Sequence, residues 1–282
     1  DDYSWAYEDS FTDSEDTEMY IWTGEEDTPD GTWLWTADSI THEAGHALGL
    51  SHDGTTQGVE YYEGHGAGLT AWAPIMGWTH EGLSHWSIGD YTNANNTEDD
   101  LAIITTQNGF TFRRDDHGDT PDMASDLSFE DTAPSSGIIE TPLDIDTFQF
   151  TLEQTSTVRL HLTPNAIAPN LDIEATLLDD SGAELWVANP QTTLDATIDQ
   201  ILETGRYTLI IDGIGYDDPL SDGYSDYGSL GRYRIHAQLE TNGVDEETAA
   251  GCACSTTKPS WSCSSLFIAG VVLFQRRQGR TI

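Results

Sequence analysis

Three histidines and a glutamate stand at metal-ligand spacing within one short stretch, from His42 to His52. His42 and His46 are four residues apart, so on an α-helix their side chains lie on one face, ~5–6 Å apart, where two imidazoles can share one ion. Glu43 is one step round that face. The spacing therefore indicates a metal site on a helix, with a carboxyl group beside it.

His52 can join that site only if the helix ends before it. In an unbroken helix His52 would lie ~9 Å beyond His46 along the axis, out of reach of a zinc ion that binds nitrogen at ~2.0–2.1 Å. Gly49 predicts the helix end, because glycine tolerates the left-handed conformation that turns the chain back. Three neutral imidazoles would leave a fourth position open for water, which is the arrangement of a catalytic zinc and not of a closed structural one.

The run from His42 to His52 resembles the extended zinc-binding signature of the metzincin metallopeptidases. The resemblance implies that His42, His46 and His52 bind zinc. It also implies that Glu43 is the general base for a zinc-activated water that hydrolyses a peptide bond. The alternative is a helix with incidental surface histidines, which chance would place in this register on the order of once in ten thousand chains.

Met76 stands 24 residues after His52, between a proline and a glycine in the segment 73–77. The metzincin resemblance implies that this segment is the methionine turn beneath the metal, the alternative being a methionine that only fills the core. Asp53 resembles the acid that supports the site in the reprolysin-like branch, or it is a surface turn residue. His65 either lines the cleft and binds a second ion or is an ordinary loop histidine.

The region before the helix is short for a metzincin. Such catalytic domains have a substantial N-terminal subdomain, yet only 41 residues precede His42. Residues 1–30 are strongly acidic and, by composition, predict a solvated or poorly ordered lead-in. We therefore expect either a reduced N-terminal subdomain or a chain that is a piece of a longer precursor. After Met76, the acidic start and apolar continuation of residues 95–104 predict a closing helix.

From Phe148 onward, apolar and polar residues alternate with a period of two. This pattern predicts an antiparallel β-sandwich in which each sheet has one solvent-exposed face. His161 and His236 fall on the polar positions and are expected to face solvent. The clearest runs are 148–152, 158–162, 171–177 and 233–239.

The segment 223–233, with 205–209 before it, resembles the bacterial pre-peptidase C-terminal (PPC) domain that follows the catalytic domains of secreted peptidases. The resemblance covers about residues 120–241 and implies a domain that in some cases binds calcium or insoluble protein. Asp144, Asp146 and Asp172 are the candidate calcium ligands, and plain surface acids are the alternative.

The chain carries 50 acidic and 10 basic residues and a formal charge of -40. This charge excludes a nucleic-acid partner and disfavours anionic membranes, because phosphate recognition needs basic patches. Such self-repulsion is screened by salt. The large negative charge therefore indicates a salt-rich, marine or halophilic, extracellular setting. The alternative is that the acidic residues serve only solubility.

The three cysteines, Cys252, Cys254 and Cys263, all lie in the tail, and no signal peptide is visible. The apolar run 266–274 is nine residues long, far short of the ~20 that a membrane-spanning helix needs. With the arginines after it, the tail resembles the C-terminal sorting tags of some Gram-negative bacteria. This implies a transient membrane contact and cleavage near Cys252 or Cys254, the alternative being a frayed tail.

The sequence as a whole predicts a metzincin-type α+β catalytic region followed by an all-β antiparallel sandwich. The predicted function is that of a secreted or cell-surface zinc metalloendopeptidase, with a protein or peptide substrate, zinc and, at the candidate acids, calcium. The alternative is a non-catalytic surface-binding protein that uses the sandwich and keeps a relic zinc site. The predicted regions are 1–117 (catalytic), 118–136 (linker and start of the accessory domain), 137–241 (sandwich) and 242–282 (tail).

Overall fold

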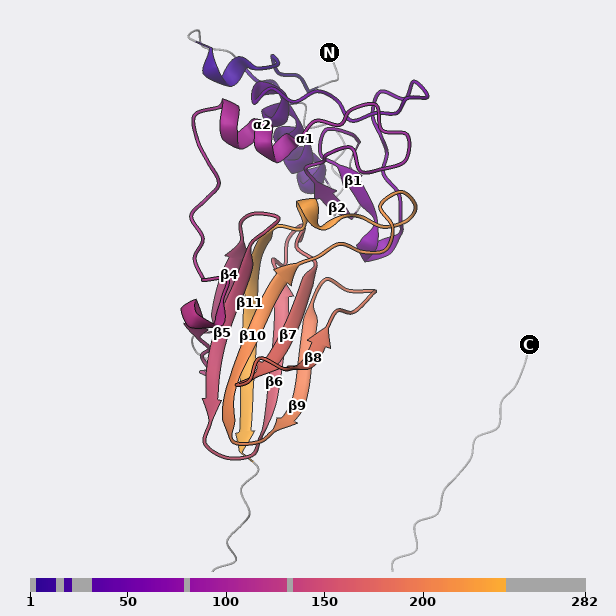
Figure 1. Ribbon diagram of the computed structural model, residues 1–282. Coiled ribbons are helices and arrows are strands. Elements are labelled where there is room, and N and C mark those ends of the chain that lie inside the picture. Colours follow the sequence, from indigo (N-terminus) through magenta and orange to yellow (C-terminus); the bar gives the residue numbers. More distant parts are fainter. Residues whose placement is uncertain (1–3, 14–17, 22–31, 79–81, 131–133, 242–282) are drawn as a thin grey trace, which may run out of the picture. The chain divides into compact units, whose positions relative to one another are not determined.

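The computed structural model describes residues 4–13, 18–21, 32–78, 82–130 and 134–241, all within one compact unit. These residues are mostly β, with two α-helices and a two-layer sandwich (Figure 1). None of their helices has the length and hydrophobicity needed to span a bilayer. The predicted sorting tag and its cysteines lie outside the described residues.

Helix α1, Thr32–Ala47, carries the first two histidines of the zinc signature. It ends in a Schellman motif, in which the N–H groups of Gly49 and Leu50 donate to the carbonyls of His46 and Gly45. Gly49 has a φ of 96°, which confirms that this glycine ends the helix. The reversal directs the chain back along α1 toward His52.

A small apolar core lies beneath α1, formed by Leu50, Ile75 and Met76. A Cβ on Gly45 would come within 2.4 Å of the Met76 sulfur, so the glycine allows the methionine to pack directly against the helix. Helix α2, Asp100–Gln107, covers the same core through Ile103 and Ile104. A helix is thus present where residues 95–104 predicted one, although it begins later, at Asp100, after the N-cap Asp99, whose side chain accepts from the Ala102 N–H.

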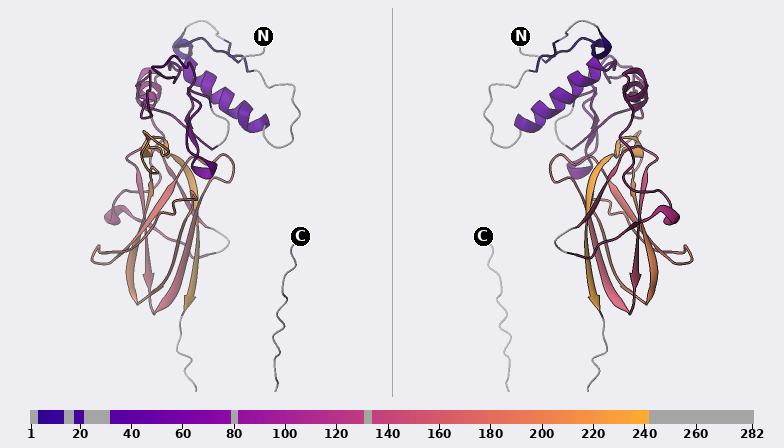
Figure 2. Two further views of the ribbon diagram at one scale, coloured as in Figure 1. Left: turned by 90° about the vertical axis from the view of Figure 1, so that its right-hand side faces the viewer. Right: turned by 90° about the vertical axis from the view of Figure 1, so that its left-hand side faces the viewer.

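The sandwich has a five-stranded sheet in the order β3-β5-β10-β7-β8 and a four-stranded sheet in the order β4-β11-β6-β9 (Figures 1 and 2). All its pairings are antiparallel except the short β3–β5 pair. The strands of these two sheets are β3 Ser125–Asp126, β4 Ser135–Ile139, β5 Ile145–Leu152, β6 Ser156–Pro164, β7 Ile173–Asp179, β8 Glu184–Ala188, β9 Ala196–Leu202, β10 Gly205–Gly213 and β11 Gly231–Thr241. A separate two-stranded sheet pairs β1, Trp72–Pro74, with β2, Leu83–His85.

The predicted alternation places the sandwich core as expected. The apolar positions of β5, β6, β7 and β11 lie in one buried cluster, while His161 and His236 are exposed opposite each other on neighbouring strands. Leu239 is an exception at 38% exposure, because it lies near the end of β11. The prediction of an antiparallel sandwich is confirmed.

Residues from the zinc-signature region and from the sandwich share one apolar cluster. Trp72, Leu83 and Tyr91 pack together with Leu194 and Tyr224. Polar contacts accompany this cluster, and they join Asn170 to Ser84 and His85, and Tyr227 to Asp99 and Leu101. The two sequence regions therefore meet through a common core.

The acidic lead-in differs from its prediction in the part that the structure describes. The N–H of Asp9 donates to the carbonyl of His46, Ser10 is buried, and Phe11 packs edge-on against Phe110 at 5.7 Å. Among the described acids of this segment, Glu8, Asp9, Asp13 and Glu18 are exposed, while the backbone at Asp9 and the ring of Phe11 contact later parts of the chain. Composition alone reports the charge of the segment and misses these contacts.

Candidate metal centre

The structure brings the three predicted zinc ligands together. The rings of His42, His46 and His52 have pairwise centroid distances of 4.6–5.3 Å, and one ring nitrogen from each lies within 4.8 Å of the others. The Nε2 atoms of His46 and His52 are 2.9 Å apart. The turn after α1 therefore returns His52 to the two helical histidines, as the spacing predicts.

Hydrogen bonds on the far side of each ring orient these imidazoles. The Nδ1 atoms of His42 and His46 lie 2.8 Å from the carbonyl oxygens of Ile75 and Leu50. Because a carbonyl oxygen only accepts, each Nδ1 carries the proton and the Nε2 of the neutral ring presents a lone pair.

His52 has a similar partner, because its Nδ1 lies 3.4 Å from a carboxylate oxygen of Glu60. That carboxylate also favours the proton on Nδ1, which leaves the Nε2 lone pairs of His46 and His52 facing each other at 2.9 Å. Two facing lone pairs repel unless a cation lies between them. The donor set is nitrogen only and fits zinc.

Burial favours the neutral form of His42 and of His52. It lowers the pKa of His42 to about 4, with the neighbouring imidazoles acting in the same direction. Burial also lowers the pKa of His52, although Glu60 opposes the shift. Because metal ligands must be deprotonated, this environment suits metal binding at neutral pH.

Glu43 is only 5% exposed, and its Oε2 has no hydrogen-bond partner among the described residues. Burial raises its pKa to about 7, while the N–H of Ala6 donates to the carboxyl and lowers it in part. A carboxyl group with a pKa near neutrality can both take and return a proton.

The methionine turn supports the ligand set from below. The Gly77 N–H donates to the Pro74 carbonyl at 2.9 Å, which closes a tight turn, and Met76 is fully buried. The Ile75 carbonyl in this turn is the one that orients His42. Asp53 is also buried, and its N–H donates to the Met76 carbonyl at 2.8 Å. Its position agrees with a supporting role and contradicts the surface-turn alternative.

His65 lies outside the cluster of His42, His46 and His52. Its two ring nitrogens contact the Tyr62 hydroxyl and the Gly223 carbonyl, and it belongs to none of the potential metal clusters among the described residues. It borders a small cavity with Trp72 and Gly64. These contacts are those of a structural histidine.

Two residues near the metal site were not singled out from the sequence, Tyr61 and Glu60. The Tyr61 ring lies 4.3 Å from that of His52 and 6.1 Å from that of His42, measured between centroids. Both residues belong to the loop between His52 and β1, where no helical or strand periodicity relates them to the histidines. Only the folded loop shows their position.

A second cluster of potential metal ligands is made of acids at the start of the sandwich. These acids form two groups that share Asp115, one with Asp116 and Glu140 and the other with Asp144 and Asp146, and within each group one carboxylate oxygen from each residue lies within 4.8 Å of the others. Asp146 is fully buried, and burial raises its pKa to about 7. Its Oδ1 has no hydrogen-bond partner among the described residues, whereas its Oδ2 accepts from the Tyr233 hydroxyl.

The third predicted calcium ligand, Asp172, is not part of this cluster. It precedes β7 and accepts a hydrogen bond from the Tyr224 hydroxyl at 2.8 Å. Its Oδ1 is buried and has no hydrogen-bond partner among the described residues, and it belongs to no potential metal cluster among them, so its role as a calcium ligand stays a prediction. The linker acid Asp115 is grouped with Asp144 and Asp146, and it is also grouped with Asp116 and Glu140.

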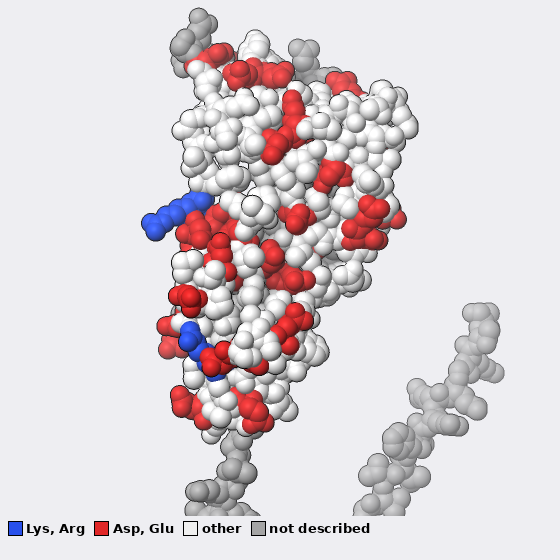
Figure 3. Space-filling model, in the orientation of Figure 1, with Lys and Arg blue, Asp and Glu red and all other residues white. Residues whose placement is uncertain are grey.

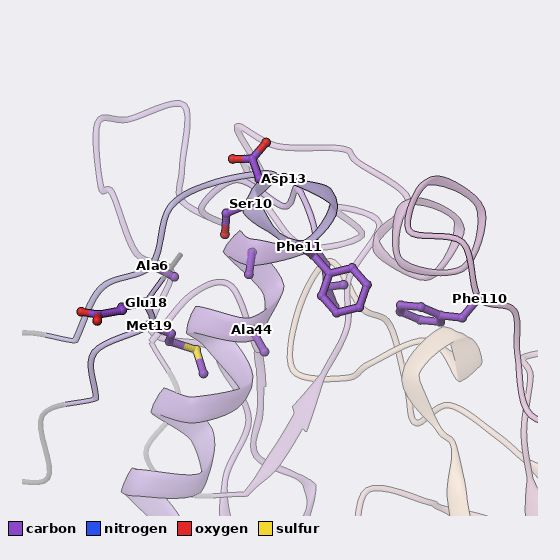
Figure 4. A pocket seen from close by; sticks show the side chains of 10 residues that line it. Ala6, Ser10, Phe11, Asp13, Glu18, Met19, Ala44 and Phe110 are labelled. Carbon is purple, nitrogen blue, oxygen red and sulfur yellow. The ribbon is translucent and has the colours of Figure 1, made fainter. Parts of the chain in front are cut away.

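An open cavity of about 500 Å³ lies between the lead-in and α1 (Figure 4). Phe11 and Met19 line it from the lead-in, Ala44 and Leu48 from α1 and its end, and Phe110 from the segment after α2. None of the candidate zinc ligands lines it. The cavity is therefore separate from the metal centre.

Comparisons with known proteins give distant likenesses. The chain matches no protein-family model and no curated protein. It is similar to the pre-peptidase C-terminal domain of collagenase from Bacillus anthracis, with 11% identity over 43% of this chain and 100% of that one, at a TM-score of 0.32. It is similar to Aeromonas hydrophila PliG, a periplasmic inhibitor of g-type lysozyme, with 10% identity over 42% of this chain and 96% of that one, at a TM-score of 0.31. Likenesses this distant carry no functional argument, and the sandwich is defined by its own sheets.

Proposed function

We propose that the protein is a zinc-dependent metalloendopeptidase of metzincin type with a PPC-like accessory sandwich. One observation carries the proposal: the Nε2 lone pairs of His46 and His52 face each other at 2.9 Å, with His42 beside them. The buried carboxyl of Glu43 lies next in the chain to His42. Nitrogen ligands for a metal ion, with a general base beside them, are the groups that metal-assisted hydrolysis requires.

Each residue has a defined task in this proposal. His42, His46 and His52 hold the ion, and their carbonyl and carboxylate partners keep the Nε2 atoms turned inward. When bound, zinc supplies Lewis-acid chemistry and lowers the pKa of a water molecule. Glu43 would take a proton from the attacking water as its oxygen forms the new C–O bond, and would then give that proton to the amine nitrogen as the peptide C–N bond breaks.

A chelation experiment tests the proposal. We expect the purified protein to cleave an unfolded protein, to lose this activity after zinc is removed with a chelator, and to regain it with about one equivalent of zinc. Peptide mass spectrometry of the products identifies internal cleavage. Activity that survives complete removal of the metal would contradict the proposal, and a serine-protease inhibitor serves as the negative control.

We also propose a calcium site at Asp115, Asp116, Glu140, Asp144 and Asp146. Carboxylate oxygens are the ligands calcium prefers. The fully buried Asp146, with one unpartnered oxygen, is the observation that favours a bound cation over plain surface acids. The site would join the linker acids to β5 and to the turn that precedes it.

Calcium should stabilise the fold. At ~100 times its dissociation constant it adds about 2.7 kcal/mol. At ~2–4 °C per kcal/mol, the melting temperature should rise by roughly 5–10 °C. The pKa of Asp146 is raised in the folded state, so the cation-free protein loses stability from this group as pH rises from about 4 to about 7. Calcium should therefore act most strongly above that range.

The measurement is calorimetry with and without calcium on wild type, Asp146→Asn and the exposed control Asp180→Asn. Asp146→Asn keeps a partner for Tyr233 and should lose the calcium effect, whereas Asp180→Asn should keep it. An equal response in all three proteins would show that calcium only screens surface charge.

The surface charge supports a secreted or cell-surface location in salt-rich surroundings. Acidic side chains are spread over the face shown in Figure 3, with few basic ones among them. Salt ions screen such repulsion, with a Debye length of ~3 Å at 1 M against ~8 Å at 0.15 M. A protein or peptide substrate fits the proposed chemistry.

A further inference from the structure

Tyr61 borders the proposed zinc centre although it lies outside the histidine signature. Its ring lies 4.3 Å from His52, 6.1 Å from His42 and 5.9 Å from Trp78, measured between centroids. It thus contacts two of the three ligand rings and is backed by a tryptophan just beyond the methionine turn.

Two backbone hydrogen bonds of the next residue, Tyr62, hold the loop that carries Tyr61 against the metal site. The N–H of Tyr62 donates to the Asp53 carbonyl at 2.7 Å, and the Tyr62 carbonyl accepts from the Trp78 N–H at 2.9 Å. Asp53 directly follows the third histidine, and Trp78 follows the turn that holds Met76. The loop is thereby tied to both supports of the ligand set.

The two neighbouring tyrosines have different surroundings. Tyr62 stacks on Tyr91 with centroids 4.3 Å apart, and its hydroxyl lies 2.7 Å from Nδ1 of His65. Tyr61 contacts the ligand rings instead, and no hydrogen bond joins its hydroxyl to another residue that the structure describes. A half-buried phenol with no partner among the described residues has its donor available to a ligand at the site.

The other donors at the centre are already engaged. The Nδ1 atoms of His42 and His46 are paired with backbone carbonyls, and Nδ1 of His52 faces Glu60. Glu43 is required as the base. Among the described residues, Tyr61 is therefore the side chain beside the ligand rings whose donor is not engaged.

We propose that Tyr61 is a catalytic residue of the peptidase proposed above, on which this inference rests. Its hydroxyl donates a hydrogen bond to the carbonyl oxygen of the scissile peptide as that oxygen gains negative charge. Tyr61 keeps its proton throughout, while Glu43 moves the proton of the attacking water to the leaving amine. Loss of one such donor typically lowers kcat by ~10²–10³-fold.

The test compares Tyr61→Phe with Tyr62→Phe, a matched loss of one hydroxyl in the next residue. Tyr61→Phe keeps the ring contacts, so zinc content and KM should stay at wild-type values while kcat falls ~100-fold or more. Tyr62→Phe should leave kcat within a few-fold of wild type. Equal kcat in wild type and Tyr61→Phe would overturn the proposal, as would loss of zinc from Tyr61→Phe, which would show a packing role.

A second measurement does not depend on turnover. The cobalt-substituted proteins are titrated with a peptide phosphinate, whose anionic tetrahedral group resembles the reacting centre, and the visible cobalt spectrum reports binding. Tyr61→Phe should bind the phosphinate at least ~10-fold more weakly, because a charge-assisted hydrogen bond is lost.

The two measurements separate the possible failures. A wild-type protein that binds cobalt and phosphinate but cleaves nothing contradicts the proposed function, while the titration still decides the role of Tyr61. Equal phosphinate affinity in wild type and Tyr61→Phe overturns the inference even if the protein is a peptidase. A wild-type protein that binds no cobalt overturns both.

Discussion

Replacing Glu43 by glutamine is expected to abolish cleavage of an unfolded protein while about one zinc per chain stays bound. Glutamine keeps the shape of the buried side chain and can still accept from the Ala6 N–H, but it cannot take a proton from water. Loss of a general base costs ~10²–10⁴-fold in rate. The measurements are kcat on a protein substrate and zinc content by elemental analysis.

The exposed Glu63 provides the matched control, since it lies in the same loop region as Tyr61 but outside the ligand set. Glu63→Gln should keep wild-type activity. If wild type binds zinc yet cleaves nothing, the alternative of a surface-binding protein with a relic zinc site is favoured. A Glu43→Gln variant with full activity would instead show that another group acts as the base.

Replacing His46 by alanine is expected to remove the zinc altogether. Two imidazoles make an incomplete site. A zinc site with three protein ligands loses most of its affinity for zinc when any one ligand is removed. Zinc content should fall from about one equivalent to near zero after dialysis, and activity should fall with it. Because His46 also contacts the Leu50 carbonyl, circular dichroism must show that α1 still forms.

His236→Ala is the control for this experiment, since it removes an exposed histidine on β11. Equal zinc in wild type, His46→Ala and His236→Ala would show that the metal binds elsewhere. Retention of zinc by the control and its loss from His46→Ala alone would locate the ion at the triad.

The parts of this protein that local rules govern could be predicted from the sequence. Gly49 ends α1 because helix termination depends on one residue and its backbone angles, and the position of His52 follows from that turn. The alternation along β5 and β6 predicted buried and exposed faces for the same reason, since successive strand residues point to opposite sides.

Features that depend on tertiary pairing could not be predicted in this way. Asp172 looked equivalent to Asp146 in the sequence, yet one bonds Tyr224 and the other lies among the linker acids. Tyr61 reaches the ligand rings only through bonds that tie its loop to Asp53 and Trp78. No spacing rule reports which loop residue will face a site formed by another segment.

The apolar cluster that joins Trp72, Leu83 and Tyr91 to Leu194 and Tyr224 makes the sandwich part of the folding unit of the metal centre. Cutting the chain between the two regions would uncover aromatic side chains on both pieces, and exposed apolar surface of this kind promotes aggregation. A different sandwich could replace this one only if it offered matching residues at the junction. The sandwich therefore shares part of its core with the region of the three histidines, unlike a tethered module whose core is its own.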